Sequence, residues 1–116
     1  MNECIFCKIA TGEIPCDKLY EDDDVVAFSD INPAAPVHIL IIPKKHLPTL
    51  NDIDDKNAHL IAKMHLVAKE LAHAKKISAG GYRIIINCNS DAGQEVFHLH
   101  LHLLGGKPLG PMIACR

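Results

Sequence analysis

The sequence has no long apolar run, no excess of one charge and no internal repeat. No stretch approaches the ~20 apolar residues that span a bilayer, and the first ten residues lack the apolar core of roughly 7–15 residues found in signal peptides. Twelve basic residues stand against 14 acidic ones, and they form no stripe suited to nucleic acid. We therefore expect a cytoplasmic protein that binds neither nucleic acid nor a membrane.

What is present fits one globular domain. The 116 residues are 48% hydrophobic, enough to bury a core, and no linker divides them, so we expect a single domain over residues 1–116. The cysteine count of five is odd, which argues against a disulfide framework. Cys4 and Cys7 form a C-x-x-C pair, which is either half of a metal site or a redox pair.

The most informative stretch is HLHLHLLGG, residues 98–106. Alternate side chains of a strand share a face, so His98, His100 and His102 point to one side and the leucines between them to the other. The outer imidazoles attach about 6.6 Å from the middle one, close enough for all three to touch one small anionic group. Polar residues on an open strand face need no function, but histidines suit metal binding or proton exchange.

The other periodic segments predict an α+β fold with an antiparallel sheet. Strands are expected at 19–20, 25–28, 37–42 and 82–88, with a short helix ending at Gly12 and one long helix at 54–78. Asp54 or Asn51 is expected to cap the long helix, and the Gly-Gly pair at 80–81 to stop it. His38 heads a segment that reads as a strand buried on both faces. It needs hydrogen-bond partners there, which fits a satisfied core histidine as well as a catalytic one.

Residues 98–104 resemble the signature of the histidine triad family, His-φ-His-φ-His-φ-φ with φ apolar, without a mismatch. The resemblance continues through GYRIIINCNSDAGQEVF, GGKPLGPM, IFCKIATGEIP and AFSDINPAAPVHILIIPKKH, which together with the helix cover nearly the whole chain. It is closest to the Hint branch, the histidine triad nucleotide-binding proteins, and to bacterial members. It implies a five-stranded antiparallel sheet with one long helix and a short N-terminal helix, and a homodimer paired through the long helix and the strand at Tyr82.

A zinc site is one implication for individual residues. His46 follows the strand at 37–42, and with the C-x-x-C pair and one triad histidine it completes a Cys₂His₂ set suited to tetrahedral zinc. Some family branches bind structural zinc at the positions of Cys4, Cys7, His46 and His98, whereas many Hint proteins lack the C-x-x-C. The alternative is that both cysteines only pack and that His46 is a surface residue. No organic cofactor is expected.

The resemblance also implies a nucleotide site. Asp30 would accept hydrogen bonds from the ribose hydroxyls, although an aspartate there also suits a turn or a cap. Beyond the triad members His100 and His102, the contacts would come from residues against the base and from a loop at the phosphate and sugar: Ile5, Phe6, Ile31, Asn87, Gly93, Gln94 and Glu95. Related proteins often have serine in place of Glu95, and a carboxylate repels phosphate. We therefore expect that contact to run through the backbone.

The chain shows neither an acidic metal cage nor a Ser-His-Asp set, so a histidine is the expected nucleophile. We expect His100 to attack the α-phosphorus of a purine nucleoside monophosphate carried on an amine, after which water cleaves the nucleotidyl-histidine. His38, His98 and His102 would orient the cluster, donate hydrogen bonds or pass protons. The other ring nitrogen of the nucleophile must donate to a fixed acceptor, and we expect a backbone carbonyl.

This interpretation predicts a purine nucleoside phosphoramidate hydrolase. Two alternatives stay open. One is a dinucleoside polyphosphate hydrolase, which differs in its leaving group. The other is a non-catalytic nucleotide-binding interaction module, in which turnover is incidental.

Overall fold

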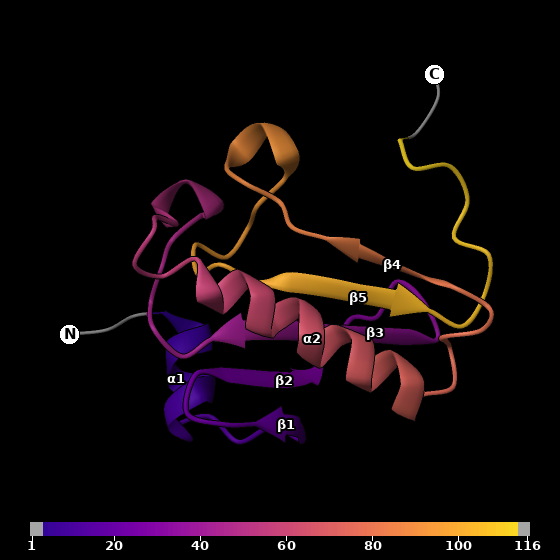
Figure 1. Ribbon diagram of the computed structural model, residues 1–116, viewed down its shortest axis with the longest axis horizontal. Helices are drawn as coiled ribbons and strands as arrows, with labels where there is room; N and C mark the ends of the chain where they lie inside the picture. Colours follow the sequence, from indigo (N-terminus) through magenta and orange to yellow (C-terminus); the bar gives the residue numbers. More distant parts are fainter. Residues whose placement is uncertain (1–3, 114–116) are drawn as a thin grey trace.

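The sheet has the strand order β1-β2-β3-β5-β4, and every neighbouring pair is antiparallel. The computed structural model describes residues 4–113, and Figure 1 shows helix α2 lying across the sheet. The strands are β1 (Lys18–Glu21), β2 (Val25–Ser29), β3 (Val37–Pro43), β4 (Tyr82–Ile85) and β5 (Leu101–Gly105). The helices are α1 (Ile5–Thr11), α2 (His59–Ala74) and two 3₁₀ turns, Leu50–Asp52 and Ser90–Ala92. The expected α+β architecture is confirmed.

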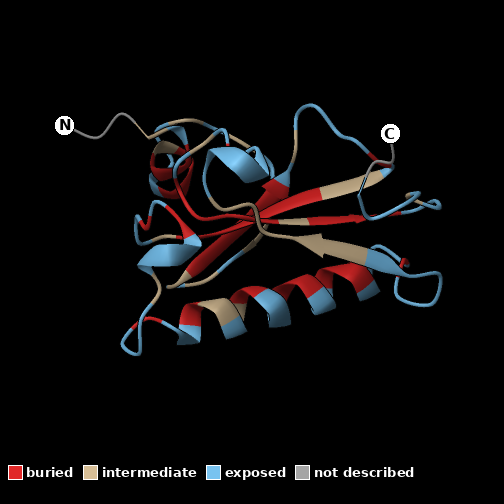
Figure 2. Cartoon of the chain, turned by 90° about the horizontal axis from the view of Figure 1, so that it is seen from above, coloured by how far each residue is buried: buried red, intermediate tan, exposed pale blue. Residues whose placement is uncertain are grey.

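The two α-helices cover opposite faces of the sheet. Side chains alternate along β3, so Ile39 and Ile41 join the core beneath α2 while Leu40 and Ile42 join the core beneath α1. Figure 2 shows the buried side of α2 turned toward the sheet and its exposed side turned outward. Strand β3 is therefore buried on both faces, as its apolar sequence predicts.

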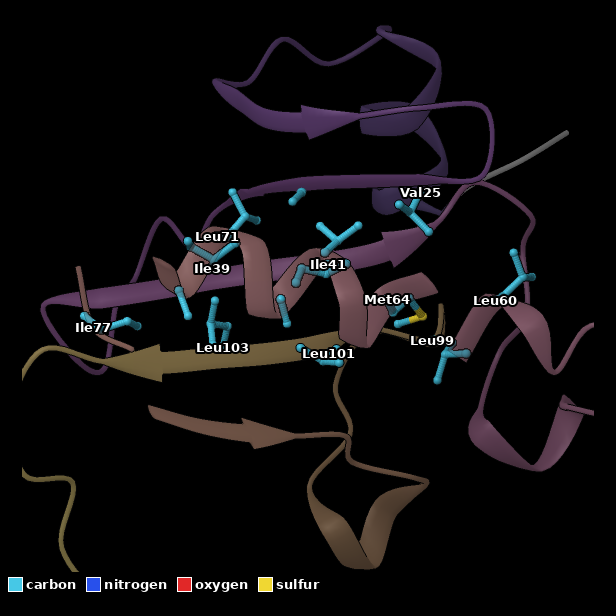
Figure 3. Packing of buried hydrophobic residues seen from close by; sticks show 14 of the residues in the cluster. Val25, Ile39, Ile41, Leu60, Met64, Leu71, Ile77, Leu99, Leu101 and Leu103 are labelled. Carbon is cyan, nitrogen blue, oxygen red and sulfur yellow. The ribbon is translucent and has the colours of Figure 1, made fainter. Parts of the chain in front are cut away.

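Strand β5 and the residues just before it follow the same alternation, so the leucines face the core beneath α2 and the histidines face the opposite side. Leu99, Leu101 and Leu103 are 0–1% exposed and pack in the core with α2 (Figure 3). The intervening histidines face the side that α1 covers, since Phe6 of α1 contacts the rings of His98 and His100. The shared face expected from the sequence is confirmed, although the strand itself begins only at Leu101.

The long helix is shorter than the expected 54–78. Asp54 accepts the backbone N–H groups of Lys56 and Asn57, and Asn57 accepts the N–H of Asp54. These bonds close a separate turn, so α2 begins at His59 and has no side-chain cap. At the other end Lys76 adopts a left-handed φ of 63°, which stops the helix before the glycine pair is reached.

The strand expected at 82–88 is also shorter than predicted. Strand β4 covers Tyr82–Ile85, and the residues up to Cys88 leave the sheet and lead into the 3₁₀ turn at Ser90–Ala92. Within the described residues, no helix is long and apolar enough to cross a membrane.

The contrast between the two faces of β5 can be tested by truncating a leucine. Leu101→Ala should lower the free energy of unfolding by about 2–5 kcal/mol, because it opens a cavity in a fully packed core. Ile31→Ala in the connection between β2 and β3, where the side chain is 91% exposed, should change it by less than about 0.5 kcal/mol. Urea unfolding followed by circular dichroism measures both, and equal losses would contradict this placement.

Candidate active site and metal centre

The three triad histidines form a continuous row beneath α1. The rings of His100 and His102 lie 5.0 Å apart between centroids. The ring of Phe6 sits edge-on to His100 at 5.1 Å and to His98 at 5.9 Å. His98 and His100 are buried and His102 is partly exposed, so the row opens toward its His102 end.

The hydrogen bonds of His100 fix its tautomer. Its Nδ1 lies 2.7 Å from the backbone oxygen of His98. A carbonyl only accepts, so Nδ1 carries the proton. The Nε2 atom of the neutral ring then holds a free lone pair, and no described residue donates a hydrogen bond to it. This is the arrangement expected of a histidine nucleophile, with the backbone carbonyl as the fixed acceptor.

A second pair of histidines is oriented in the same way. The backbone N–H of Ala34 donates to Nδ1 of His38 at 3.0 Å, which places the proton of the neutral His38 ring on Nε2. That Nε2–H donates to Nδ1 of His102 at 2.9 Å. In the neutral His102 the remaining proton is then on Nε2, beside His100. The chain of bonds from Ala34 through His38 to His102, here called the relay, therefore places the Nε2–H donor of His102 beside the ring of His100, whose Nε2 holds the lone pair.

Asp30 lies at the edge of this relay. Its Oδ1 accepts the backbone N–H of Asn32 at 2.8 Å, and its Oδ2 is 3.5 Å from Nε2 of His38. The carboxylate therefore caps a turn and also faces the histidine pair. The expected turn role and a role at the site coexist in one residue.

Burial keeps the outer triad histidines neutral near pH 7. Desolvation, followed by the neighbouring His100 and His38, lowers the pKa of His102 to about 4, although Asp30 opposes this. Desolvation also lowers the pKa of His98 to about 4, and the nearby rings of His46 and His100 add to the effect, while the bond to Pro43 opposes it. Neutral imidazoles are the forms that donate to phosphoryl oxygens or bind metal.

The ring of His98 lies in a cluster with Cys4, Cys7 and His46. The four candidate ligand atoms all lie within 4.8 Å of one another. The Nδ1 atom of His98 is 3.3 Å from Sγ of Cys4, 3.5 Å from Sγ of Cys7 and 3.2 Å from Nδ1 of His46. The cluster joins α1, the segment after β3 and the start of the triad.

The donor set fits a tetrahedral metal ion. Metal–ligand bonds of about 2.0–2.3 Å separate the ligand atoms by about 3.3–3.8 Å, close to the separations found here. Nε2–H of His98 donates to the backbone oxygen of Pro43 at 2.8 Å, so its Nδ1 lone pair faces the thiols. Such an outer-shell bond is the usual way a metal-binding histidine is oriented. These four residues could therefore hold a metal, and the ring of His98 is committed to them rather than to proton transfer.

The residues expected at the nucleotide are placed unequally. Ile5 and Ile31 are 48% and 91% exposed and are available to a base, whereas Phe6 is buried. The Gln94 side chain is engaged in holding its own loop: it accepts from the N–H of Asn89 and donates to the carbonyls of Pro48 and Val96. It therefore shapes the loop, and only a rearrangement would let it touch a ligand.

Of the backbone N–H groups of Gly93, Gln94 and Glu95, two are also used within this loop. The N–H groups of Gly93 and Gln94 donate to the carbonyls of Ser90 and Asn89 at 2.9 and 3.1 Å. The Glu95 N–H has no acceptor among the described residues, so it is the donor available to a phosphate. Asn87 is partly buried and lies two residues after the end of β4, on the way into the loop.

Three functional groups of the site were not foreseen, and all are backbone atoms. They are the N–H of Ala34 and the carbonyls of Pro43 and His98, which set the tautomers of His38, His98 and His100. For His100 only the kind of acceptor could be anticipated. No side-chain pattern reports which backbone group will meet a ring nitrogen.

An antiparallel sheet that carries alternate histidines beneath a short N-terminal helix defines a histidine triad domain. The family model of the HIT domain matches residues 11–109. This chain belongs to the HIT family.

Individual relatives cover almost the whole chain. Purine nucleoside phosphoramidase of Escherichia coli strain K12 is 52% identical over 113 residues, or 97% of this chain and 95% of the relative. A crystal structure of a histidine triad protein from Clostridium difficile is 52% identical with a TM-score of 0.93, covering 97% of this chain and 98% of that one. A HIT family hydrolase from Clostridium thermocellum is 49% identical with a TM-score of 0.94, covering 98% and 99%.

The lowered pKa of His102 predicts a pH-dependent stability. The unfolded ring binds a proton near pH 6.5 and the folded ring near pH 4, so protons favour the unfolded state and stability falls as the pH drops through this window. Between pH 7 and 5 we expect His102 to contribute a loss of roughly 1 kcal/mol, after allowing for solvent screening. Urea unfolding at both pH values should show a smaller loss in His102→Gln than in the wild type. Identical losses would contradict the shift.

Proposed function

We propose that this protein hydrolyses purine nucleoside phosphoramidates, releasing an amine and a nucleoside monophosphate. The observation that carries the proposal is the 2.7 Å bond from Nδ1–H of His100 to the carbonyl of His98, which leaves Nε2 as a nucleophile. The substrate class is supported by the 52% identity with the E. coli purine nucleoside phosphoramidase.

The reaction proceeds in two displacements at phosphorus. Nε2 of His100 forms a bond to the α-phosphorus as the bond from phosphorus to the amine nitrogen breaks. Water then forms a P–O bond as the bond to Nε2 breaks, its released proton restores the group that protonated the amine, and the nucleoside monophosphate leaves. The carbonyl of His98 holds the Nδ1 proton and supports the positive charge that the ring acquires in the first step.

His102 supplies the complementary proton donor. No described residue accepts from its Nε2, so this N–H is available to the phosphoryl oxygens or to the departing amine, which leaves well only with a proton. His38 acts as a positioning residue by holding the other nitrogen of His102, and Asp30 lies beside both rings and within reach of a ribose. The Glu95 N–H adds a backbone donor for the phosphate.

The central test replaces the nucleophile. His100→Ala should lower amine release from adenosine phosphoramidate by at least about 10³-fold, because no other group can form the nucleotidyl intermediate, while AMP binding measured by calorimetry persists. The exposed His73→Ala on α2 serves as the matched control and should keep full activity.

The outcomes separate the alternatives. Undiminished turnover by His100→Ala would refute the mechanism. Faster release of AMP from a diadenosine polyphosphate than from the phosphoramidate would favour the dinucleoside polyphosphate hydrolase. Nucleotide binding without turnover by the wild type would favour the interaction module.

We further propose that the metal is zinc, bound by Cys4, Cys7, His46 and His98. Two thiolates and two imidazoles are a set that zinc favours. The ion supplies structure, because four protein ligands leave no open position for a substrate. Elemental analysis after purification with added zinc should give one zinc per chain, and Cys7→Ser should lose at least about 90% of it under a competing chelator. Cys16→Ser, which removes a thiol outside the cluster, should keep it, and equal loss in both variants would argue against this centre.

We also propose that the protein acts as a homodimer in the cytoplasm. Strand β4 is an edge of the sheet, and an unpaired edge can extend into a second copy. Tyr82 on this strand and Leu66 on α2 are 36% and 56% exposed, which supplies apolar surface for pairing. Reduced thiols suited to metal binding are typical of a cytoplasmic protein.

A further inference from the structure

The metal centre and the nucleophile are joined by a single residue. His98 gives its ring to the cluster through Nδ1 and its backbone oxygen to Nδ1–H of His100 at 2.7 Å. A shift of the His98 backbone therefore moves both the ring in the cluster and the acceptor that fixes the His100 tautomer. The cluster and the nucleophile are therefore linked through the backbone and side chain of one residue, His98.

Helix α1 makes a second connection. Cys4 is the N-cap of the helix, where its Sγ accepts the N–H of Cys7 at 3.4 Å. Phe6 stands between the two cysteines and places its ring against His100, 5.1 Å between centroids. A helix of seven residues is too short to be stable alone in water. Its position over the triad therefore depends on its packing and on the cluster at its N-terminus.

A third connection comes from the segment after β3. This segment carries the ligand His46, and its Leu47 carbonyl accepts the N–H of Leu99 at 2.6 Å. Pro43 holds the other nitrogen of His98. The strand β3 and the segment after it are thus bonded to His98 and Leu99, the two residues before the nucleophile.

We propose that Cys4, Cys7 and His46 are positioning residues for the hydrolysis: by holding a metal together with His98 they set the position and tautomer of His100, so that metal occupancy controls catalytic rate. The inference rests on the proposed function in taking His100 as the nucleophile. Without the ion, the contacts of the two cysteines to His46 and His98 run through thiols, which are weak hydrogen-bonding partners. The carbonyl of His98 and the ring of Phe6 then lose their fixed places beside His100.

His46 offers the sharpest probe, because the residue is exposed and its Nδ1 contacts Cys7 and His98 rather than His100. We expect metal-depleted wild type to lose about 10- to 100-fold in kcat, the scale of a small misplacement of a reacting group, and to regain it with added zinc. In His46→Gln the zinc-binding curve and the activity curve should move together to higher zinc. His73→Gln is the matched control and should leave both curves in place.

A second readout does not depend on turnover. The ¹⁵N resonances of His100 report which ring nitrogen carries the proton. They should show a defined Nδ1–H tautomer in the zinc-loaded protein and a mixture after depletion, with the same zinc midpoint as the binding curve. Circular dichroism at 25 °C establishes that the depleted protein is folded, which separates this effect from loss of the fold.

Depleted, folded wild type with unchanged kcat and unchanged His100 resonances would overturn the inference. If depletion unfolds the wild type, zinc-loaded His46→Gln decides the question: wild-type kcat and resonances at partial zinc occupancy would overturn the inference, and losses that track occupancy would support it. If the zinc-loaded wild type hydrolyses no phosphoramidate, the proposed function fails, and the His100 resonances alone test the coupling.

Discussion

The two-residue alternation of segment 98–104 is the constraint on which the rest of the molecule depends. Its leucines enter a core that is almost fully closed, so the segment cannot slide by one residue without exposing them and burying the histidines beneath α2. Strand β3 pairs with β5 from Val37–Gly105 to Ile41–Leu101 and fixes the register from one side, and β4 fixes it from the other. The histidines owe their positions to the energy of burying their neighbours.

Within this sheet register, hydrogen bonds to backbone groups determine which ring nitrogen of each histidine carries the proton. Three imidazoles of similar chemistry receive different acceptors or donors: His98 donates to Pro43, His100 donates to His98, and His38 accepts from Ala34. Each bond selects one tautomer, and the neutral rings then offer a metal-facing lone pair, a reaction-facing lone pair and a relay proton. Because these partners belong to the sheet and its connections, each tautomer depends on the position of its backbone partner.

The parts of the structure that could be predicted are those that follow from the order of apolar and polar side chains. Alternation in 98–104 and the apolar run at 37–42 predict which faces are buried, and the structure agrees. The ends of α2 could not be predicted from periodicity. The Asp54–Asn57 turn satisfies its own backbone, and Lys76 adopts a left-handed conformation that is unusual for a side chain other than glycine. At the second end, the left-handed Lys76 is followed by Ile77, which is buried in the core.

The candidate site also has parts that could be predicted from the sequence and parts that could not. The grouping of Cys4, Cys7, His46 and His98 was suggested by matching residues across the chain, and the fold brings the four together. The engagement of Gln94 in its own loop was not foreseeable, because a buried amide and a ligand-facing amide look alike in a sequence. Nor could the alternation show that His98 turns into a cluster while His100 does not, since α1 lies some 90 residues away in the chain.

A consequence follows from placing a metal ligand two residues before a nucleophile. His98, one of the four residues that could hold the ion, also supplies the carbonyl that orients the ring of His100. A substitution at His98 would therefore combine two effects, loss of a ligand and disturbance of the segment that carries the acceptor. The backbone acceptor itself survives any side-chain change at that position. The ligands remote from the triad, above all His46, are for that reason the positions at which the metal contribution can be separated from the chemistry of His100.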